Sequence, residues 1–129
     1  MRRTGFNGVV MVQENALQRQ VNAHRDRARN GAREAAPLDW VRRAALLVID
    51  DLGTAGRKDG KPTEAWLAAM EDVIDYRYSK RLPTIITTNL TRAQIAKLYQ
   101  LRIAGRLDEI ADYYEIAQTN WRRQREDKR

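Results

Sequence analysis

Four runs of mainly apolar residues predict the strands of a sheet. Residues 8–12 form a short β-branched run, which predicts the first strand. The runs at 44–49 and 82–87 are apolar without alternation, a pattern typical of strands buried on both faces. A last short strand is predicted at 113–117, ahead of a charged tail.

The spacing of apolar residues predicts helices between and after these strands. Apolar residues recur at helical spacing over 63–80, which predicts an amphipathic helix. Thr91 and Gln94 have the spacing of a capping box, so a helix should begin there, and a second helical stretch is expected at 101–109. The polar stretch from 13 to about 33 predicts a poorly buried helix, or two short ones. Alternating strands and helices favour an α/β fold with a mainly parallel sheet.

Composition narrows the class of protein. The chain has 129 residues, enough for one domain, and no cysteine, which excludes disulfides and thiolate metal sites. No apolar run is as long as a membrane span, and residues 1–12 lack the long apolar stretch of a signal peptide. We therefore expect no membrane partner and a cytoplasmic location.

The charge is unevenly distributed along the chain. The formal net charge is +7, and residues 1–43 hold nine arginines, no lysine and four acids, a net of +5. Arginine pairs well with phosphate, so a polyanion such as nucleic acid is one interpretation of this excess. A solvated basic surface is the other interpretation, and the charge alone does not separate the two.

Two neighbouring acids, Asp50 and Asp51, follow the strand predicted at 44–49. Ligands of open parallel sheets bind at the carboxyl ends of the strands. In a nucleotide hydrolase the first acid at this place holds Mg²⁺, usually through water. The second acid orients or deprotonates the attacking water. The alternative is a strand that merely ends in a solvated acidic turn.

Two further polar patterns fit the same chemistry. Asn89, after Thr87 and Thr88, would lie beside the two acids if their strands are neighbours, where its amide could bond to a γ-phosphate or the attacking water. The alternative is an ordinary strand-to-helix turn, in which asparagine is common. Arg102 and Arg106 share one helical face and could stabilise phosphoryl-transfer charge, in cis or from a neighbouring subunit. A solvated basic face is the alternative for this pair.

Taken together, these segments resemble the DnaC/IstB-type family of AAA+ ATPases, which comprises bacterial and phage helicase loaders and transposition helper ATPases. The resemblance rests on the order LLVIDDLG, IDYRYSKRLPTIITTNL, LRIAGRL and NWR, and extends loosely back to Val9. It implies an α/β fold, a three-layer αβα sheet of the P-loop NTPase (AAA+) type, with residues 1–129 as part of one ATPase domain. The implied parts are a strand at 8–12, an Arg-rich helical element at 13–36, a Walker B to sensor-2 region at 44–123 and a basic tail at 124–129.

The resemblance also implies a role for each candidate residue, and ATP and Mg²⁺ as cofactors of the complete domain. Asp50 corresponds to the Walker B acid that binds Mg²⁺ through water, and Asp51 to the catalytic carboxylate. Asn89 corresponds to the sensor-1 residue. Arg106 corresponds to the arginine finger that acts on nucleotide held by the adjacent subunit, with Arg102 beside it.

Further arginines are assigned by the same resemblance. Arg122, after Trp121, matches the sensor-2 arginine that touches nucleotide in its own subunit. Helicase loaders carry an extra helical element after their second strand that faces single-stranded DNA. The candidates for backbone contacts in that element are Arg19, Arg25, Arg27, Arg29 and Arg33. The alternative for these five residues is again a solvated helix face.

The sequence lacks the Walker A motif, whose backbone N–H groups cradle phosphates in this class of ATPase. The one Gly-Lys pair, Gly60-Lys61, is followed by Pro62 and is not preceded by a buried strand. The family would place its P-loop and first strand before residue 1. Because the family's strand order is 5-1-4-3-2, that strand is an interior one. The strand at 113–117 must then pair beside the one at 82–87, or an apolar edge stays open and promotes association.

The resulting prediction is a helicase-loader-like AAA+ ATPase of DNA replication, truncated or split, that binds ATP weakly or not at all by itself. Whether this chain hydrolyses ATP is left open. The implied partners are a replicative helicase, single-stranded DNA, and further subunits of a homo-oligomer or an intact paralogue. The alternatives are a transposition helper ATPase, a non-enzymatic remnant that joins the rings of a paralogue, and a small basic DNA-binding protein.

Overall fold

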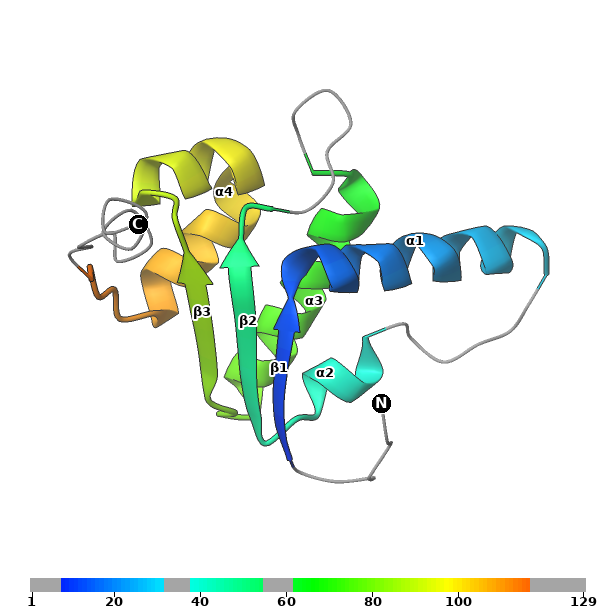
Figure 1. The fold of residues 1–129 in the computed structure, drawn as a ribbon, viewed down its shortest axis with the longest axis horizontal. Helices are drawn as coiled ribbons and strands as arrows, with labels where there is room; N and C mark the ends of the chain where they lie inside the picture. Colours follow the sequence, from blue (N-terminus) through cyan, green and yellow to red (C-terminus); the bar gives the residue numbers. More distant parts are fainter. Residues whose placement is uncertain (1–7, 32–37, 55–61, 117–129) are drawn as a thin grey trace, which may run out of the picture.

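The computed structural model describes residues 8–31, 38–54 and 62–116, which form a three-stranded sheet with connecting helices (Figure 1). All strands are parallel, in the order β1-β2-β3, so the predicted α/β fold with a parallel sheet is confirmed. The elements along the chain are β1 Val9–Gln13, α1 Glu14–Arg29, α2 Asp39–Arg42, β2 Leu46–Leu52, α3 Glu64–Ser79, β3 Thr84–Thr88 and α4 Arg92–Ile110.

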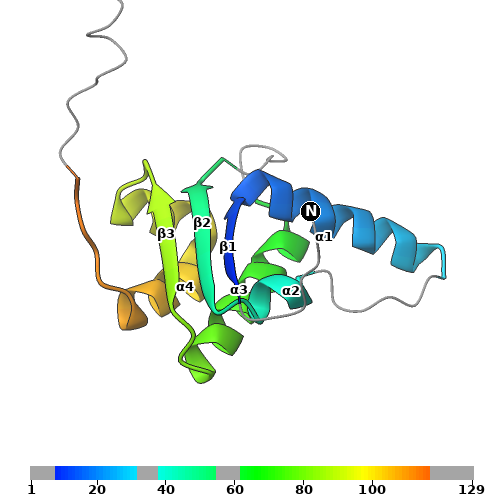
Figure 2. The ribbon, with the colours of Figure 1, turned by 60° about the horizontal axis from the view of Figure 1, so that its bottom comes forward.

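Helices α3 and α4 lie on the same side of the sheet (Figures 1 and 2). Helix α1 starts at the end of β1, which is an edge strand, and extends past this edge of the sheet. On the covered face, Leu47 and Ile49 of β2 are fully buried, as is Trp66 of α3. On the opposite face Met11 and Ile85 flank β2, and their side chains are 65% and 51% exposed. The core of the described residues therefore lies between the sheet and one layer of helices.

The prediction that the strands at 44–49 and 82–87 are buried on both faces is wrong for the described residues. Along β2, fully buried positions alternate with half-buried ones, and β3 has no fully buried residue. An unbroken apolar run indicates two-sided burial only where helices cover both faces of the sheet. Here the helices of the described segments cover one face, and β3 also lies at the edge.

The strand predicted at 113–117 does not form over 113–116, and Ala117 lies outside the described residues. The guanidinium of Arg92 lies 4.2 Å from the centroid of the Tyr113 ring and donates a 2.8 Å hydrogen bond to Asp108. These contacts hold the start of the segment against α4. Within the described part of the chain, β3 therefore has no neighbour on its outer side, which is the open-edge alternative.

The helix predicted to begin at Thr91 is α4, and its capping box is present. The side chain of Thr91 accepts a hydrogen bond from the Gln94 backbone N–H, and the Gln94 side chain accepts one from the Thr91 N–H. Gln100, with φ 60, interrupts the helix, so the second helical stretch predicted at 101–109 is also present. Neither α4 nor another helix in the described ranges is long and apolar enough to cross a membrane.

A buried arginine holds the amino ends of β2 and β3 together. Arg77 occupies a core-facing position of α3 and is 1% exposed. Burial lowers the pKa of its guanidinium, whose charge is met by carbonyl oxygens and a hydroxyl. It donates to the carbonyls of Val41 (3.1 Å), Arg42 (2.9 Å), Ala44 (2.6 Å) and Pro83 (2.7 Å), and to the hydroxyl of Thr84 (2.8 Å).

Candidate functional site

Asp50 and Asp51 form a β-bulge at the carboxyl end of the central strand. The register between β2 and β3 shifts between Ile49 and Leu52, so the two acids together oppose the single residue Thr87. We call this pair of residues the acidic bulge. Asp51 adopts a left-handed backbone with φ 58, a conformation that costs a non-glycine residue about 1–2 kcal/mol. Bulges are common next to active sites because they redirect side chains.

The hydroxyl of Thr87 bonds to both residues of the acidic bulge. It donates to Oδ1 of Asp50 at 2.5 Å and accepts from the backbone N–H of Asp51 at 3.0 Å. The next hydroxyl, on Thr88, donates to the Leu52 carbonyl at 2.8 Å, just beyond the bulge. The threonines that precede Asn89 therefore fix the turn that carries the acids, a role that the sequence did not reveal.

Sequence reasoning also missed Glu14, a fully buried carboxylate at the start of α1. It accepts hydrogen bonds from the Gly53 N–H (2.7 Å), Trp66 Nε1 (3.0 Å) and the Tyr99 hydroxyl (2.5 Å). Gly53 has φ 105, and a Cβ there would lie 2.6 Å from the Leu90 side chain, so glycine is required. The available signal was an acid directly after an apolar strand, where a long polar helix begins.

Asn89 lies one residue beyond β3, with an exposed side chain. The sequence places Asn89 beside the two acids only if the strands that carry them are neighbours. This requirement is met, because β2 pairs with β3. Asp50 and Asp51 are themselves half-buried, so water and a ligand can reach them. The structure thus brings three of the predicted site residues to one end of two adjacent strands.

The carboxylates of the acidic bulge are compatible with a magnesium ion. In the described ranges there is no group of three or more histidine, cysteine or acidic side chains that could hold a metal ion. Mg²⁺ keeps several waters and is usually bound by one or two carboxylates together with substrate phosphates, so two carboxylates suffice. Thr87 occupies one position on Asp50, and a carboxylate offers about four acceptor positions. The acidic bulge therefore fits a hard cation held mainly through water.

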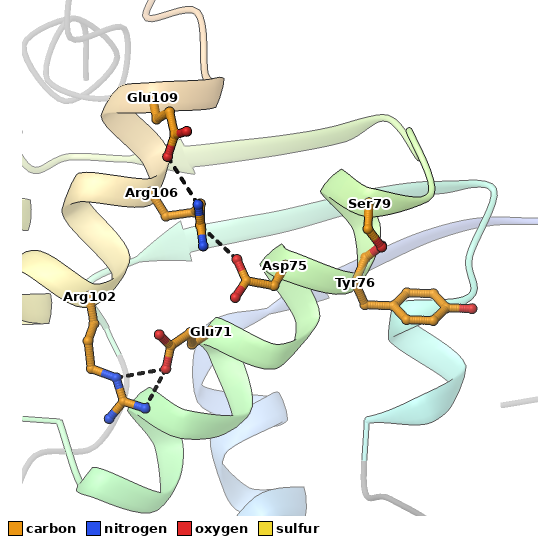
Figure 3. A network of polar contacts seen from close by, with 7 residues as sticks. All are labelled: Glu71, Asp75, Tyr76, Ser79, Arg102, Arg106 and Glu109. Carbon is orange, nitrogen blue, oxygen red and sulfur yellow. Dashed lines mark hydrogen bonds and ion pairs between the residues drawn. The ribbon is translucent and has the colours of Figure 1, made fainter.

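The two candidate arginines of α4, Arg102 and Arg106, pair with acids of α3 and α4 (Figure 3). Arg102 donates from Nε to Glu71 at 2.7 Å. Nε of Arg106 lies 2.7 Å from Asp75, and its NH1 lies 3.0 Å from Glu109. These contacts raise the pKa of both guanidinium groups, chiefly through the hydrogen bond to Glu71 and the charge of Asp75 respectively. The acids that pair with both arginines lie on α3 and α4 and not in the acidic bulge.

The predicted DNA-contacting helix is α1, a single helix that leaves the core after Val21. Leu17 and Val21 are buried, whereas no residue at 22–29 is fully buried, and this half projects past the sheet (Figure 2). The predicted DNA-contacting residues that are described, all with exposed side chains, are Arg19, Arg25, Arg27 and Arg29. Arg33 and the predicted sensor-2 residue Arg122 lie outside the described residues.

Comparison with known proteins adds evidence on the fold. No protein-family model matches this sequence. No curated protein matches it either. The structure is similar to the crystal structure of the DnaC helicase loader, with a TM-score of 0.62 and 21% sequence identity. The similar region covers 85% of this chain and 61% of that chain, so this chain spans less than two thirds of the loader's length. The predicted fold class, a parallel α/β sheet of the P-loop NTPase type, is thereby confirmed.

Proposed function

We propose that this chain supplies the Walker B acids, the sensor-1 amide and an arginine finger of a helicase-loader-like AAA+ ATPase that acts in DNA replication. The observation that carries the proposal is the acidic bulge on the central strand, next to the strand that leads to Asn89. Ligands of open parallel sheets bind at this edge. The similarity of the fold to the DnaC helicase loader supports the same assignment.

In this proposal each candidate residue at the carboxyl ends of β2 and β3 has one task. Asp50 holds Mg²⁺ through water, Asp51 orients the attacking water, and Asn89 bonds to that water or to the terminal phosphate. Bound Mg²⁺ supplies charge neutralisation on the phosphates of ATP. The 129 residues contain no Walker A motif, so we propose that they bind ATP tightly only together with a phosphate-binding loop that this sequence does not include.

Arg106 is proposed to act on nucleotide in an adjacent subunit, with Arg102 beside it. To reach a phosphate, Arg106 must leave Asp75 and Glu109, to which it is bonded in the single chain. Exposed ion pairs contribute little net stability, because hydration and side-chain entropy offset the attraction. A neighbouring subunit that presents a triphosphate can therefore compete with the two carboxylates for this guanidinium.

The proposed partners follow from the same assignment. A replicative helicase is the cargo, single-stranded DNA is contacted by the arginines of α1, and further ATPase subunits complete a ring in the cytoplasm. The sensor-2 role of Arg122 is also part of the proposal. A transposition helper ATPase would use the same residues, so the helicase is the partner that distinguishes the two members of this class.

The proposal is tested first by reading about a hundred codons upstream of Met1, about the length of a small domain. If a strand and a Walker A motif lie in frame, the extended protein is expressed and its ATP hydrolysis measured. Asp50→Asn and Asp51→Asn should each lower the rate about a hundredfold or more, and Asp112→Asn should leave it unchanged. An Asp50→Asn protein with an undiminished rate would contradict the enzymatic assignment.

If no such motif is found upstream, the test is stimulation in trans. The chain is mixed with an intact loader from the same source, and ATP hydrolysis by the mixture is measured with wild-type and Arg106→Ala protein. Stimulation that depends on Arg106 supports an arginine finger acting between subunits. Equal rates with both proteins would contradict that role.

The projecting basic half of α1 favours a second candidate, a DNA-binding module without a nucleotide role. Its exposed arginines do not depend on the acidic bulge, because they lie on a different element. Single-stranded DNA binding that is independent of ATP, sensitive to salt and unaffected by Asp50→Ala would support this candidate. DNA binding that requires ATP and Asp50 would support the loader assignment instead.

A further inference from the structure

We infer that Thr87 is a positioning residue that sets the geometry of the acidic bulge from the neighbouring strand. The inference rests on the proposed function, because it concerns the acids proposed to hold Mg²⁺ and the attacking water. It goes beyond that proposal by assigning a residue outside the Walker B segment to the same site.

The hydroxyl of Thr87 meets two different needs of the bulge. A bulge takes residues out of the regular ladder, and the register leaves Asp50 and Asp51 without paired residues on β3. The Asp51 N–H donates to the Thr87 hydroxyl instead, at 3.0 Å. The proton of the same hydroxyl is donated to Oδ1 of Asp50 at 2.5 Å. One side chain therefore satisfies the backbone of one acid and orients the carboxylate of the other.

Thr87 is well suited to fix these positions. A β-branched side chain has few χ1 rotamers, and Thr87 stands on a strand that is hydrogen-bonded to β2. Its hydroxyl therefore has a defined place, and its bond to Asp50 favours one orientation of that carboxylate. The bond to the Asp51 N–H stabilises a backbone conformation, φ 58, that is otherwise strained.

Neighbouring contacts hold other parts of the turn. The Asp51 carbonyl accepts from the Thr54 hydroxyl (2.7 Å) and N–H (3.3 Å), but this contact does not reach the Asp50 carboxylate. Thr88 bonds to the carbonyl of Leu52, and Glu14 accepts from the N–H of Gly53, both beyond the bulge. The loss of either contact would loosen the loop after β2. The loss of the Thr87 hydroxyl would instead remove a bond from the carboxylate that is proposed to hold the metal.

The test compares the full chain with three variants of β3. Thr87→Val removes the hydroxyl and keeps the shape, and Thr87→Ser keeps the hydroxyl. Thr84→Val is the matched control, because it removes a hydroxyl from the other end of the same strand, where Thr84 accepts from Arg77 at 2.8 Å. Two quantities are measured by NMR: the rate of exchange of the Asp51 amide with water, and the Mn²⁺ concentration that half-broadens the Asp50 and Asp51 signals.

In Thr87→Val, we expect the Asp51 amide to exchange about fivefold faster or more, because a hydrogen bond of ordinary strength is lost. The half-broadening Mn²⁺ concentration should rise about tenfold or more, as is typical when a partner of a metal ligand is removed. Thr87→Ser should stay close to the wild type in both measurements. Thr84→Val should leave both quantities at the acidic bulge unchanged.

Two results would overturn the inference. One is an Asp51 exchange rate that is the same in Thr87→Val and wild-type protein. The other is an equal change in Thr84→Val, which would indicate a general loosening of β3. If Mn²⁺ does not broaden the Asp50 signal even in the wild type, the metal-binding part of the proposed function fails. The exchange rates then still decide whether Thr87 positions the bulge.

Discussion

The buried carboxylate of Glu14 accepts a 3.0 Å hydrogen bond from the indole Nε1 of Trp66, which lies 52 residues further along the chain. Both side chains are 0% exposed. A carboxylate removed from water is stable only when donors replace its hydration, and further donors here include the Gly53 N–H and the Tyr99 hydroxyl. Glu14 thus joins α1, the loop after β2, α3 and α4 at one point.

Glu14→Gln should lower the free energy of unfolding by about 1–3 kcal/mol. One carboxylate oxygen accepts from Trp66 and Tyr99, and the other accepts from Gly53. A glutamine amide nitrogen accepts no hydrogen bond, so at least one buried donor loses its partner. The measurement is urea unfolding followed by tryptophan fluorescence.

Glu64→Gln is the matched control for Glu14→Gln. Glu64 also lies in the first turn of a helix, but its side chain is 79% exposed. Its substitution should change the free energy of unfolding by no more than about 0.5 kcal/mol. Equal effects of the two substitutions would show that Glu14 acts through the helix terminus and not through its buried bonds.

Arg77→Lys should lower the free energy of unfolding by about 3 kcal/mol, although the charge is kept. A lysine ammonium has three donors at one point and cannot reach carbonyls on both α2 and the start of β3. Buried carbonyls therefore lose their donors. The measurement is again urea unfolding, with Arg43→Lys as control, since the Arg43 side chain is 69% exposed. A loss as small as that of the control would contradict the assigned role of Arg77.

The parts of the fold that depend on local sequence could be predicted. The capping box of Thr91 and Gln94 involves residues three apart, and the apolar stripe of α3 recurs within single turns, so both are visible in the sequence. The segment at 113–116 has the composition of a strand, but strand formation needs a neighbour with unpaired backbone groups. In the described chain its contact is with α4 through Arg92, a long-range relationship that composition does not encode.

In the candidate site, too, the features that depend on local sequence could be predicted and those that depend on long-range contacts could not. Asp50 and Asp51 could be located because ligands of open parallel sheets bind at the carboxyl ends of the strands. Asn89 needed the strands before it and before the acids to be neighbours, and β2 and β3 are neighbours. The bulge was not predictable, because it depends on the register between two strands. Glu14 was missed because its donors come from three distant elements. Arg77 could have been noticed, since a charged residue on the buried stripe of a helix indicates a buried polar contact.

Asp108→Asn should make the protein less stable at neutral pH but not at acid pH. The hydrogen bond from Arg92 holds the pKa of the Asp108 carboxyl below its ordinary value. Its contribution is therefore present above the unfolded pKa of about 3.9 and is lost as the pH falls through the lower folded pKa. Thermal unfolding at pH 7 and pH 2 tests this, and an equal difference in melting temperature at both pH values would contradict it.

Arg106→Ala should lower the melting temperature by less than about 3 °C, because its ion pairs with Asp75 and Glu109 are exposed. Arg102→Ala should behave similarly, and the losses should shrink further at high salt. Calorimetry at two salt concentrations measures both effects. This outcome matters for function, because a variant that stays folded and still fails to stimulate ATP hydrolysis in trans has lost catalysis and not structure. A large loss of stability would instead make Arg106 a structural residue.

The combined variant Arg25→Ala, Arg27→Ala and Arg29→Ala should bind single-stranded DNA about tenfold more weakly at low salt. Each lost phosphate contact should also reduce the slope of log affinity against log salt by about 0.7. The measurement is fluorescence anisotropy of a labelled oligonucleotide over a salt series. The control variant combines Lys80→Ala, Arg81→Ala and Lys97→Ala, which removes three exposed positive charges outside α1. If the control loses as much affinity as the α1 variant, the attraction comes from the charge of the whole molecule. A loss confined to the α1 variant would identify the projecting half of α1 as the DNA contact.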